Sequence, residues 1–186
     1  MKGIVPSLNT PFDKDGAVDH VSLRRLVNHT IDAGCGGMLG LAVAGEHMTL
    51  TLEEKARFVE VVAETNAQRI PFIVSVTAPD KAASLALTKI ARSAGATGIC
   101  VQVPAAEDRH ENLGFLQDLA AHAPEILMVQ DLDWVGGGLP LDDIVCLFDT
   151  VEKFSWLKNE TQQAGPKYSA VLQATDGALT SVAGGP

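Results

Sequence analysis

Short apolar runs alternate with longer amphipathic stretches along the whole chain. Seven runs have the length and composition of buried strands: Ile4–Leu8, Met38–Val43, Pro71–Val76, Gly98–Val103, Ile126–Gln130, Phe154–Leu157 and Leu179–Ala183. The runs are apolar at consecutive positions, so both faces of each strand are expected to be covered, as in a parallel sheet beneath helices.

Amphipathic helices are predicted between these strands. The first three are expected to follow Asp19 or Ser22, Thr51 and Asp80, and later ones to cover Glu111–His122, Leu141–Phe148 and Tyr168–Ala174. Thr51 is followed three residues later by Glu54, which is the spacing of a capping box. The strict alternation of strand and helix indicates repeated βαβ units.

Two closures of such a sheet are considered. An open doubly wound sheet usually carries a glycine-rich phosphate-binding turn after its first strand, but the segment Asn9–Phe12 contains no glycine. We therefore predict an α/β fold of the (β/α)8 TIM-barrel type, forming one domain over residues 1–186. Such a barrel needs about 250 residues, whereas this chain has 186 and stops after the seventh predicted strand. Three explanations are open: a segment is missing, a partner chain completes the fold, or the barrel is irregular.

The composition excludes several kinds of partner. The net charge of -9 leaves no basic stripe to meet phosphates, which argues against nucleic acid. Three distant cysteines, Cys35, Cys100 and Cys146, form no CxxC pair, so neither a zinc site nor a disulfide framework is predicted. Cys100 and Cys146 lie in apolar runs and are expected to be buried thiols.

Membrane and secretory signals are also missing from the sequence pattern. No apolar run reaches the roughly 18 residues needed for a membrane span. Pro6 and Pro11 interrupt the apolar residues near the N-terminus, where a signal peptide would be continuous. We therefore expect a cytoplasmic protein.

The candidate for chemistry is Lys158, which follows the apolar run Phe154–Leu157 directly. The predicted strand places this lysine at its C-terminal end, where parallel α/β proteins carry their active sites. A free lysine has a pKa near ~10.4, and apolar walls could lower it by roughly 3 units. A neutral amine is a nucleophile that forms Schiff bases with ketones.

Several further segments lie in a fixed order around this lysine. They are Gly3–Pro6, Thr10–Phe12, Ala44–Glu46 with Thr49–Thr51, Ala94–Ala96, Val103–Pro104 and Trp156–Glu160. In this order and spacing they resemble the dihydrodipicolinate synthase / N-acetylneuraminate lyase family of Schiff-base aldolases. The resemblance covers the first part of the family's chain, which implies that the family's C-terminal part is lacking here.

The resemblance implies roles for particular residues. Lys158 matches the lysine that forms an imine with a 2-keto acid such as pyruvate. Thr10 is expected inside the barrel mouth in a hydrogen-bonding role. Glu46 matches a mostly structural glutamate. Gly184, directly after the last predicted strand, would allow the backbone to approach the substrate closely.

The sequence also departs from the family's pattern. The family carries Gly-Thr-Thr-Gly-Glu where this chain has Ala42–Glu46, so both threonine hydroxyls are missing. The backbone N–H groups of Val43, Ala44 and Gly45 could still bind a substrate carboxylate.

The family's proton-relaying tyrosine is absent as well. Our register places Val129 at its position, followed by Gln130 and Asp131, and the chain's single tyrosine is Tyr168. These departures indicate a divergent member of the family.

Proton transfer therefore needs another residue. The acid–base candidates at the strand ends are Glu46, His47, Gln130, Asp131 and Glu160. Gln130 and Asp131 are taken as catalytic, because they lie at the end of the predicted strand Ile126–Gln130 and directly after it. Glu160 is interpreted as a loop carboxylate beside Lys158 that contacts substrate, and His47 as a solvated loop histidine.

The resulting hypothesis is a lyase, either an aldolase or a dehydratase, that acts on a pyruvate-like 2-keto acid through an imine to Lys158. Imine chemistry requires neither a metal nor an organic cofactor. The resemblance further implies a homo-oligomer, either a dimer or a tetramer. The alternative is a catalytically silent relative that binds a keto acid or a sugar acid.

Overall fold

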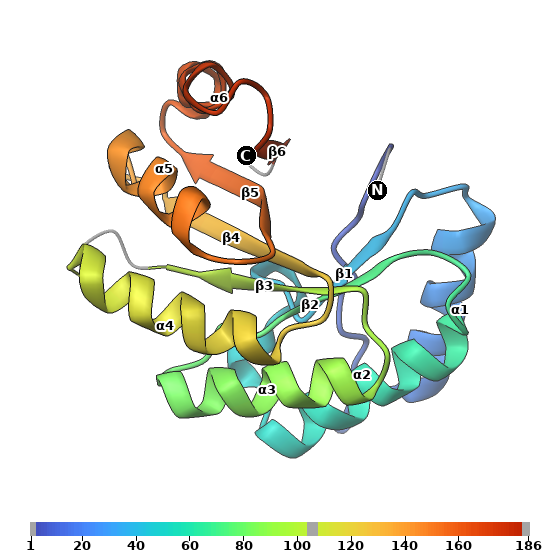
Figure 1. The fold of residues 1–186 in the computed structure, drawn as a ribbon. Coiled ribbons are helices and arrows are strands. Elements are labelled where there is room, and N and C mark those ends of the chain that lie inside the picture. Colours follow the sequence, from blue (N-terminus) through green and yellow to red (C-terminus); the bar gives the residue numbers. More distant parts are fainter. Residues whose placement is uncertain (1–2, 104–107, 184–186) are drawn as a thin grey trace. The chain divides into compact units, whose positions relative to one another are not determined.

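In the computed structural model, residues 3–103 and 108–183 are described, with backbone alone for the last four of them (Figure 1). The chain divides into two compact units, Met1–Ile99 and Cys100–Pro186. Strand β3, Gly98–Gln102, lies at the boundary between them.

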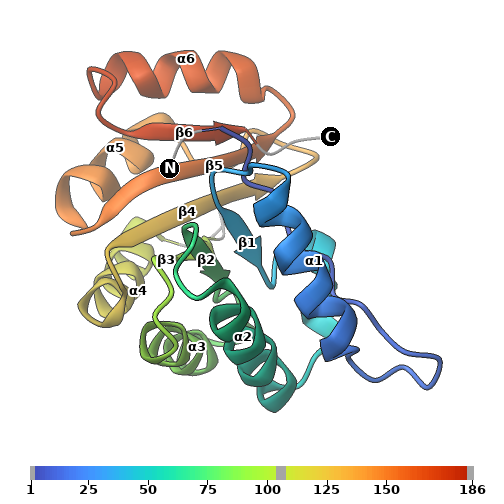
Figure 2. The same cartoon turned by 90° about the vertical axis from the view of Figure 1, so that its right-hand side faces the viewer.

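The first unit is a layer of helices packed on parallel strands. Its elements are α1 His20–Asp32, β1 Met38–Gly40, the 3-10 turns η1 Val43–Gly45 and η2 His47–Thr49, α2 Leu52–Asn66, β2 Phe72–Ser75 and α3 Lys81–Ser93. Strands β1 and β2 pair in parallel. Figure 2 shows α1, α2 and α3 side by side in sequence order. Every residue of β1 and β2 is buried.

The second unit repeats this plan. Its elements are α4 Arg109–His122, β4 Ile126–Asp133, α5 Leu141–Thr150, β5 Phe154–Thr161, α6 Ala164–Ala174 and β6 Thr180–Ala183. Strand β5 pairs in parallel with β4 on one side and with β6 on the other. The alternation of parallel strand and helix predicted from the sequence is thus present in both units.

The predicted caps of the first three helices are confirmed. Asp19 caps α1 by accepting hydrogen bonds from the N–H groups of Val21 and Ser22. Thr51 and Glu54 form the capping box at the start of α2, and Asp80 caps α3. Each of these side chains satisfies backbone donors that a helix cannot satisfy internally.

The predicted strand Ile4–Leu8 is wrong as a regular strand. The segment makes a single parallel bridge, between Ser7 and Leu39. The N–H of Leu8 donates to the carbonyl of Leu39 at 2.8 Å, and the N–H of Leu39 donates to the carbonyl of Pro6 at 2.9 Å. Pro6 has no N–H to extend the ladder, and Ile4 is 74% exposed.

Strand β1 is shorter than predicted. It ends at Gly40, because Leu41 adopts φ 56° and leaves the extended region of backbone space. The predicted end at Val43 therefore lies in the 3-10 turn instead.

Strands β4 and β5 are longer than predicted. They continue past Gln130 and Leu157 to Asp133 and Thr161, with Gln130 paired to Lys158 in register. Their polar C-terminal residues stay in the ladder because neighbouring strands bond each other along the whole length. Helix α6 also begins earlier than predicted, at Ala164, since Pro166 is tolerated in a first helical turn.

The cysteines divide between two environments. Cys100 is buried as expected, whereas Cys146 is half-buried and that expectation is wrong. Cys146 lies on the flank of α5, whose core-facing residues are Ile144 and Leu147. Among the described residues, no helix is long and apolar enough to cross a membrane.

Candidate active site

Lys158 lies inside β5, three residues before its end, and its side chain is only 13% exposed. Because side chains alternate along a strand, Lys158 and Glu160 share one face while Asn159 and Thr161 share the other. Burial follows this alternation: Leu157, Asn159 and Thr161 are buried, and the residues between them are half-buried.

A three-residue cluster forms around the Lys158 amine. Its Nζ lies 2.6 Å from Oε2 of Glu160, whose side chain is 16% exposed. Nε2 of Gln130, on β4, donates a hydrogen bond to the same Oε2. The register explains the meeting, since Gln130 and Lys158 are paired neighbours on adjacent strands.

This environment differs from the purely apolar walls expected for Lys158. The interpretation of Glu160 as a loop residue is wrong, because β5 extends through it and alternation points it toward the lysine. An amine in contact with a carboxylate can exchange a proton with it directly.

Two further titratable groups lie close to the cluster. Burial raises the pKa of the Cys100 thiol to about 12, with Lys158 opposing the shift and Glu160 adding to it. Burial also raises the pKa of Tyr168, on α6, and the negative charge of Glu160 acts in the same direction. Both groups are therefore held in their neutral forms near neutral pH.

Asp131 is not part of this cluster. It follows Gln130 on β4, so its side chain points to the opposite face of the sheet. There the carboxylate pairs with Nζ of Lys167 and accepts a hydrogen bond from the N–H of Leu139 at 2.9 Å. The side chain is 1% exposed. These contacts give Asp131 a structural role in holding the loop after β4.

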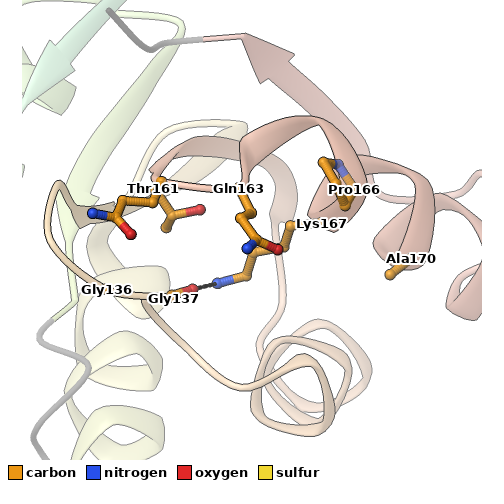
Figure 3. A pocket seen from close by; sticks show the side chains of 8 residues that line it. Gly136, Gly137, Thr161, Gln163, Pro166, Lys167 and Ala170 are labelled. Carbon is orange, nitrogen blue, oxygen red and sulfur yellow. Dashed lines mark hydrogen bonds between the residues drawn. The ribbon is translucent and has the colours of Figure 1, made fainter.

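A cavity of about 490 Å³ opens on this side of the second unit. Its lining residues are Gly136, Gly137, Thr161, Gln162, Gln163, Pro166, Lys167 and Ala170. Figure 3 shows Lys167 reaching toward the backbone of Gly137, where Nζ donates to the carbonyl oxygen at 2.5 Å. Lys158 does not line this cavity, so it is separate from the amine cluster.

The remaining predicted residues lie in the first unit. Thr10 is buried and donates from Oγ1 to the carbonyl of Gly45 at 2.6 Å. An added Cβ at Gly45 would lie 2.8 Å from the carbonyl oxygen of Leu8, so this position needs glycine for close backbone approach. The hydrogen bond predicted for Thr10 is therefore present and fixes the Gly45 turn.

The turn Val43–Gly45 retains some of the backbone N–H donors that were expected to bind a substrate carboxylate. The N–H of Gly45 donates to the carbonyl of Ala42 at 2.9 Å, so that donor is already used. Within the described part of the chain, the N–H groups of Val43 and Ala44 have no backbone acceptor. Both residues are exposed, which leaves two donors rather than three for an anion.

His47 corrects the expectation of a solvated histidine. It is 3% exposed, and burial together with the nearby charge of Lys55 lowers its pKa. Glu46 is exposed and takes φ 56° between the two 3-10 turns. Gly184 lies outside the described residues. Within residues 3–103 and 108–183, no group of three acidic, histidine or cysteine side chains could hold a metal ion.

Glu160 was expected beside Lys158, but in a loop, so the strand geometry that sets their contact was not predicted. A Lys-x-Glu spacing places both side chains on one face when the strand continues through them. The predicted strand stops at Leu157, where the apolar run stops, whereas β5 continues to Thr161.

Comparisons with known proteins agree with the fold. The Dihydrodipicolinate synthetase family profile matches residues 1–135. A 4-hydroxy-tetrahydrodipicolinate synthase from Salinibacter ruber is 33% identical over 131 residues, covering 68% of this chain and 43% of that protein. The chain thus spans less than half of this curated relative.

Solved structures extend the likeness to nearly the whole chain. An Escherichia coli K12 prophage protein of the dihydrodipicolinic acid synthase family, YagE, in complex with pyruvate, has a TM-score of 0.90 at 21% identity. An N-acetylneuraminate lyase from Mycoplasma synoviae has a TM-score of 0.85 at 19% identity. Each alignment covers 98% of this chain and 63% or 62% of the other. The predicted barrel-type fold, incomplete relative to these structures, is confirmed.

Proposed function

This chain belongs to the dihydrodipicolinate synthetase family, and on that basis we propose that it is a class I lyase that forms an imine between Lys158 and a pyruvate-like 2-keto acid. The observation that carries the proposal is the low exposure of the Lys158 side chain, 13%, near the C-terminal end of a parallel strand. This is the end of the strands where barrel enzymes carry their chemistry.

The proposed reaction uses the imine as an electron sink. Attack of the neutral amine on the ketone carbon, followed by loss of water, gives a C=N bond that accepts electrons from the adjacent carbon. A C–C bond can then be made or broken at that carbon, or water eliminated. The relative in complex with pyruvate supports a small 2-keto acid as the ligand class.

Borohydride trapping tests this proposal directly. Reduction of the protein in the presence of pyruvate should add mass to a peptide that contains Lys158, and Lys158→Ala should abolish the addition. Lys153, five residues earlier, serves as an internal control, because its amine is occupied by two backbone carbonyls of α4. Addition elsewhere, or none at all, would refute the imine.

A second candidate function is a catalytically silent keto-acid or sugar-acid binder. The turn Ala42–Gly45 carries no side-chain hydroxyl, and its Gly45 N–H is taken by Ala42, which favours this reading. Stabilisation by pyruvate without turnover across a panel of aldehydes would support it.

The assembly is also a proposal. Family membership suggests a homo-oligomer, and the chain spans less than two thirds of the relatives described above. Sedimentation at several protein concentrations would give the oligomeric state.

A further inference from the structure

We propose that Glu160 is the acid–base residue of this site and replaces the absent tyrosine relay, an inference that rests on the proposed imine chemistry of Lys158. Its Oε2 lies 2.6 Å from Nζ, the atom that would react. General acid–base catalysis requires a group within hydrogen-bonding reach of the proton that moves, and this contact meets the requirement.

The neighbouring groups leave Glu160 as the partner for proton exchange. The charges of Lys158 and Glu160 act on Cys100 of β3, but its buried thiol stays protonated. Tyr168 on α6 is likewise held neutral, so neither group can accept the first proton from the Lys158 ammonium. Asp131 on β4 points to the other face and pairs with Lys167. Within residues 3–103 and 108–183, Cys100 and Tyr168 are thus titratable neighbours on which the charges of the cluster act.

Glu160 can carry every proton that imine formation moves. Its carboxylate first takes a proton from the Lys158 ammonium, which frees the nitrogen lone pair to bond the ketone carbon. Glu160, now protonated, gives this proton to the resulting alkoxide and becomes a carboxylate again. The carboxylate then removes a second proton from nitrogen and delivers it to the hydroxyl oxygen. That oxygen leaves as water, and nitrogen forms the C=N bond. Lys158 has lost two protons to water, and Glu160 ends as it began.

Gln130 acts as a positioning residue in this scheme. Its side-chain N–H donates to the same oxygen that meets Nζ, so it fixes the carboxylate on the lysine side. Gln130 is 3% exposed, which restricts it to few side-chain orientations. It carries no proton itself, since an amide does not titrate in this range.

The test distinguishes a Glu160 that transfers protons from a Glu160 that only forms an ion pair with Lys158. Pyruvate adducts of Lys158 are trapped with borohydride at successive times, in the unchanged chain, in Glu160→Gln and in Glu160→Ala. General acid–base groups contribute about 100-fold or more to rate. We expect both variants to form the adduct at least about 100-fold more slowly, and added formate to accelerate Glu160→Ala. Glu152→Gln, the same exchange at an exposed position of the second unit, should match the unchanged chain.

The outcomes distinguish this inference from the proposed function. If the unchanged chain forms no adduct at Lys158, both fail together. If it forms the adduct and Glu160→Gln does so at an equal or greater rate, Glu160 merely holds the lysine charged and the inference is overturned. Formate rescue of Glu160→Ala, with none for Lys158→Ala, is a result that a structural role would not give. Circular dichroism spectra of all variants identify any that fail to fold.

Discussion

At the scale of single residues, burial of the Cys100 thiol links the stability of the chain to alkaline pH. The pKa of this group is raised to about 12 in the folded protein, whereas a thiol in an unfolded chain titrates near ~8.5. Between these values the unfolded chain has lost a proton that the folded chain retains. The contribution of the protonated Cys100 thiol to the free energy of unfolding is therefore fully present below pH ~8.5. It is lost as pH rises toward 12.

Cys100→Ala should remove this dependence. The free energy of unfolding of the unchanged chain should fall more steeply with pH, by up to about 1.4 kcal/mol per unit above pH 9, than that of the variant. Urea unfolding at a series of pH values measures both slopes. Below pH 8 the difference between the two proteins should be constant. Parallel curves at alkaline pH would show that the thiol does not resist ionisation.

The residues of the site could be predicted unequally. Lys158 followed from its position after an apolar run and from the family resemblance. Glu160 was expected near it in a loop, but the geometry of their contact was not, because it depends on whether β5 continues through polar residues. Asp131 was assigned to the site on proximity in sequence, yet alternation sends it to the opposite face.

At the scale of elements, strand ends were the weakest part of the prediction. The strands were expected to stop where apolar residues stop, whereas β4 and β5 continue for three and four further residues. Backbone pairing between neighbouring strands does not depend on side-chain polarity. The starts of α1, α2 and α3 were predicted well, since Asp19, Thr51 and Asp80 act through local hydrogen bonds that sequence spacing reveals.

The end of α4 gives a prediction at this scale. Nζ of Lys153 donates to the carbonyls of Ala120 and Ala123, at 2.7 and 2.9 Å. These carbonyls lie at the helix C-terminus, where a cation also meets the negative end of the helix dipole. Lys153→Met keeps the apolar stem but removes both bonds, and should lower the free energy of unfolding by about 1–2 kcal/mol.

Urea unfolding of this variant, compared with Lys89→Met, provides the measurement. Lys89 is exposed on α3, so its substitution should change stability by less than about 0.5 kcal/mol. Equal effects of the two substitutions would mean that Lys153 does not stabilise the end of α4.

At the scale of the whole molecule, the fold class was predictable because it depends on the order of elements. Runs of consecutive apolar residues separated by amphipathic helices have few architectural solutions. The parallel βα order is one of them, and it does not depend on where each strand ends. The division at Ile99 and Cys100 was not predictable, since β3 reads as one continuous apolar run across it.

Ligand binding to the whole chain provides the last prediction. A ligand that binds only the folded state stabilises it by mass action, and an excess of 100 times the dissociation constant adds about 2.7 kcal/mol. Pyruvate should therefore raise the midpoint of thermal unfolding progressively with concentration, since imine formation at Lys158 requires the folded site. Lys158→Ala should lose most of this shift. Glu160→Gln should keep it at long incubation, because the proposed role of Glu160 concerns the rate of imine formation. A shift of the same size in Lys158→Ala would show that pyruvate binds elsewhere, without using the amine.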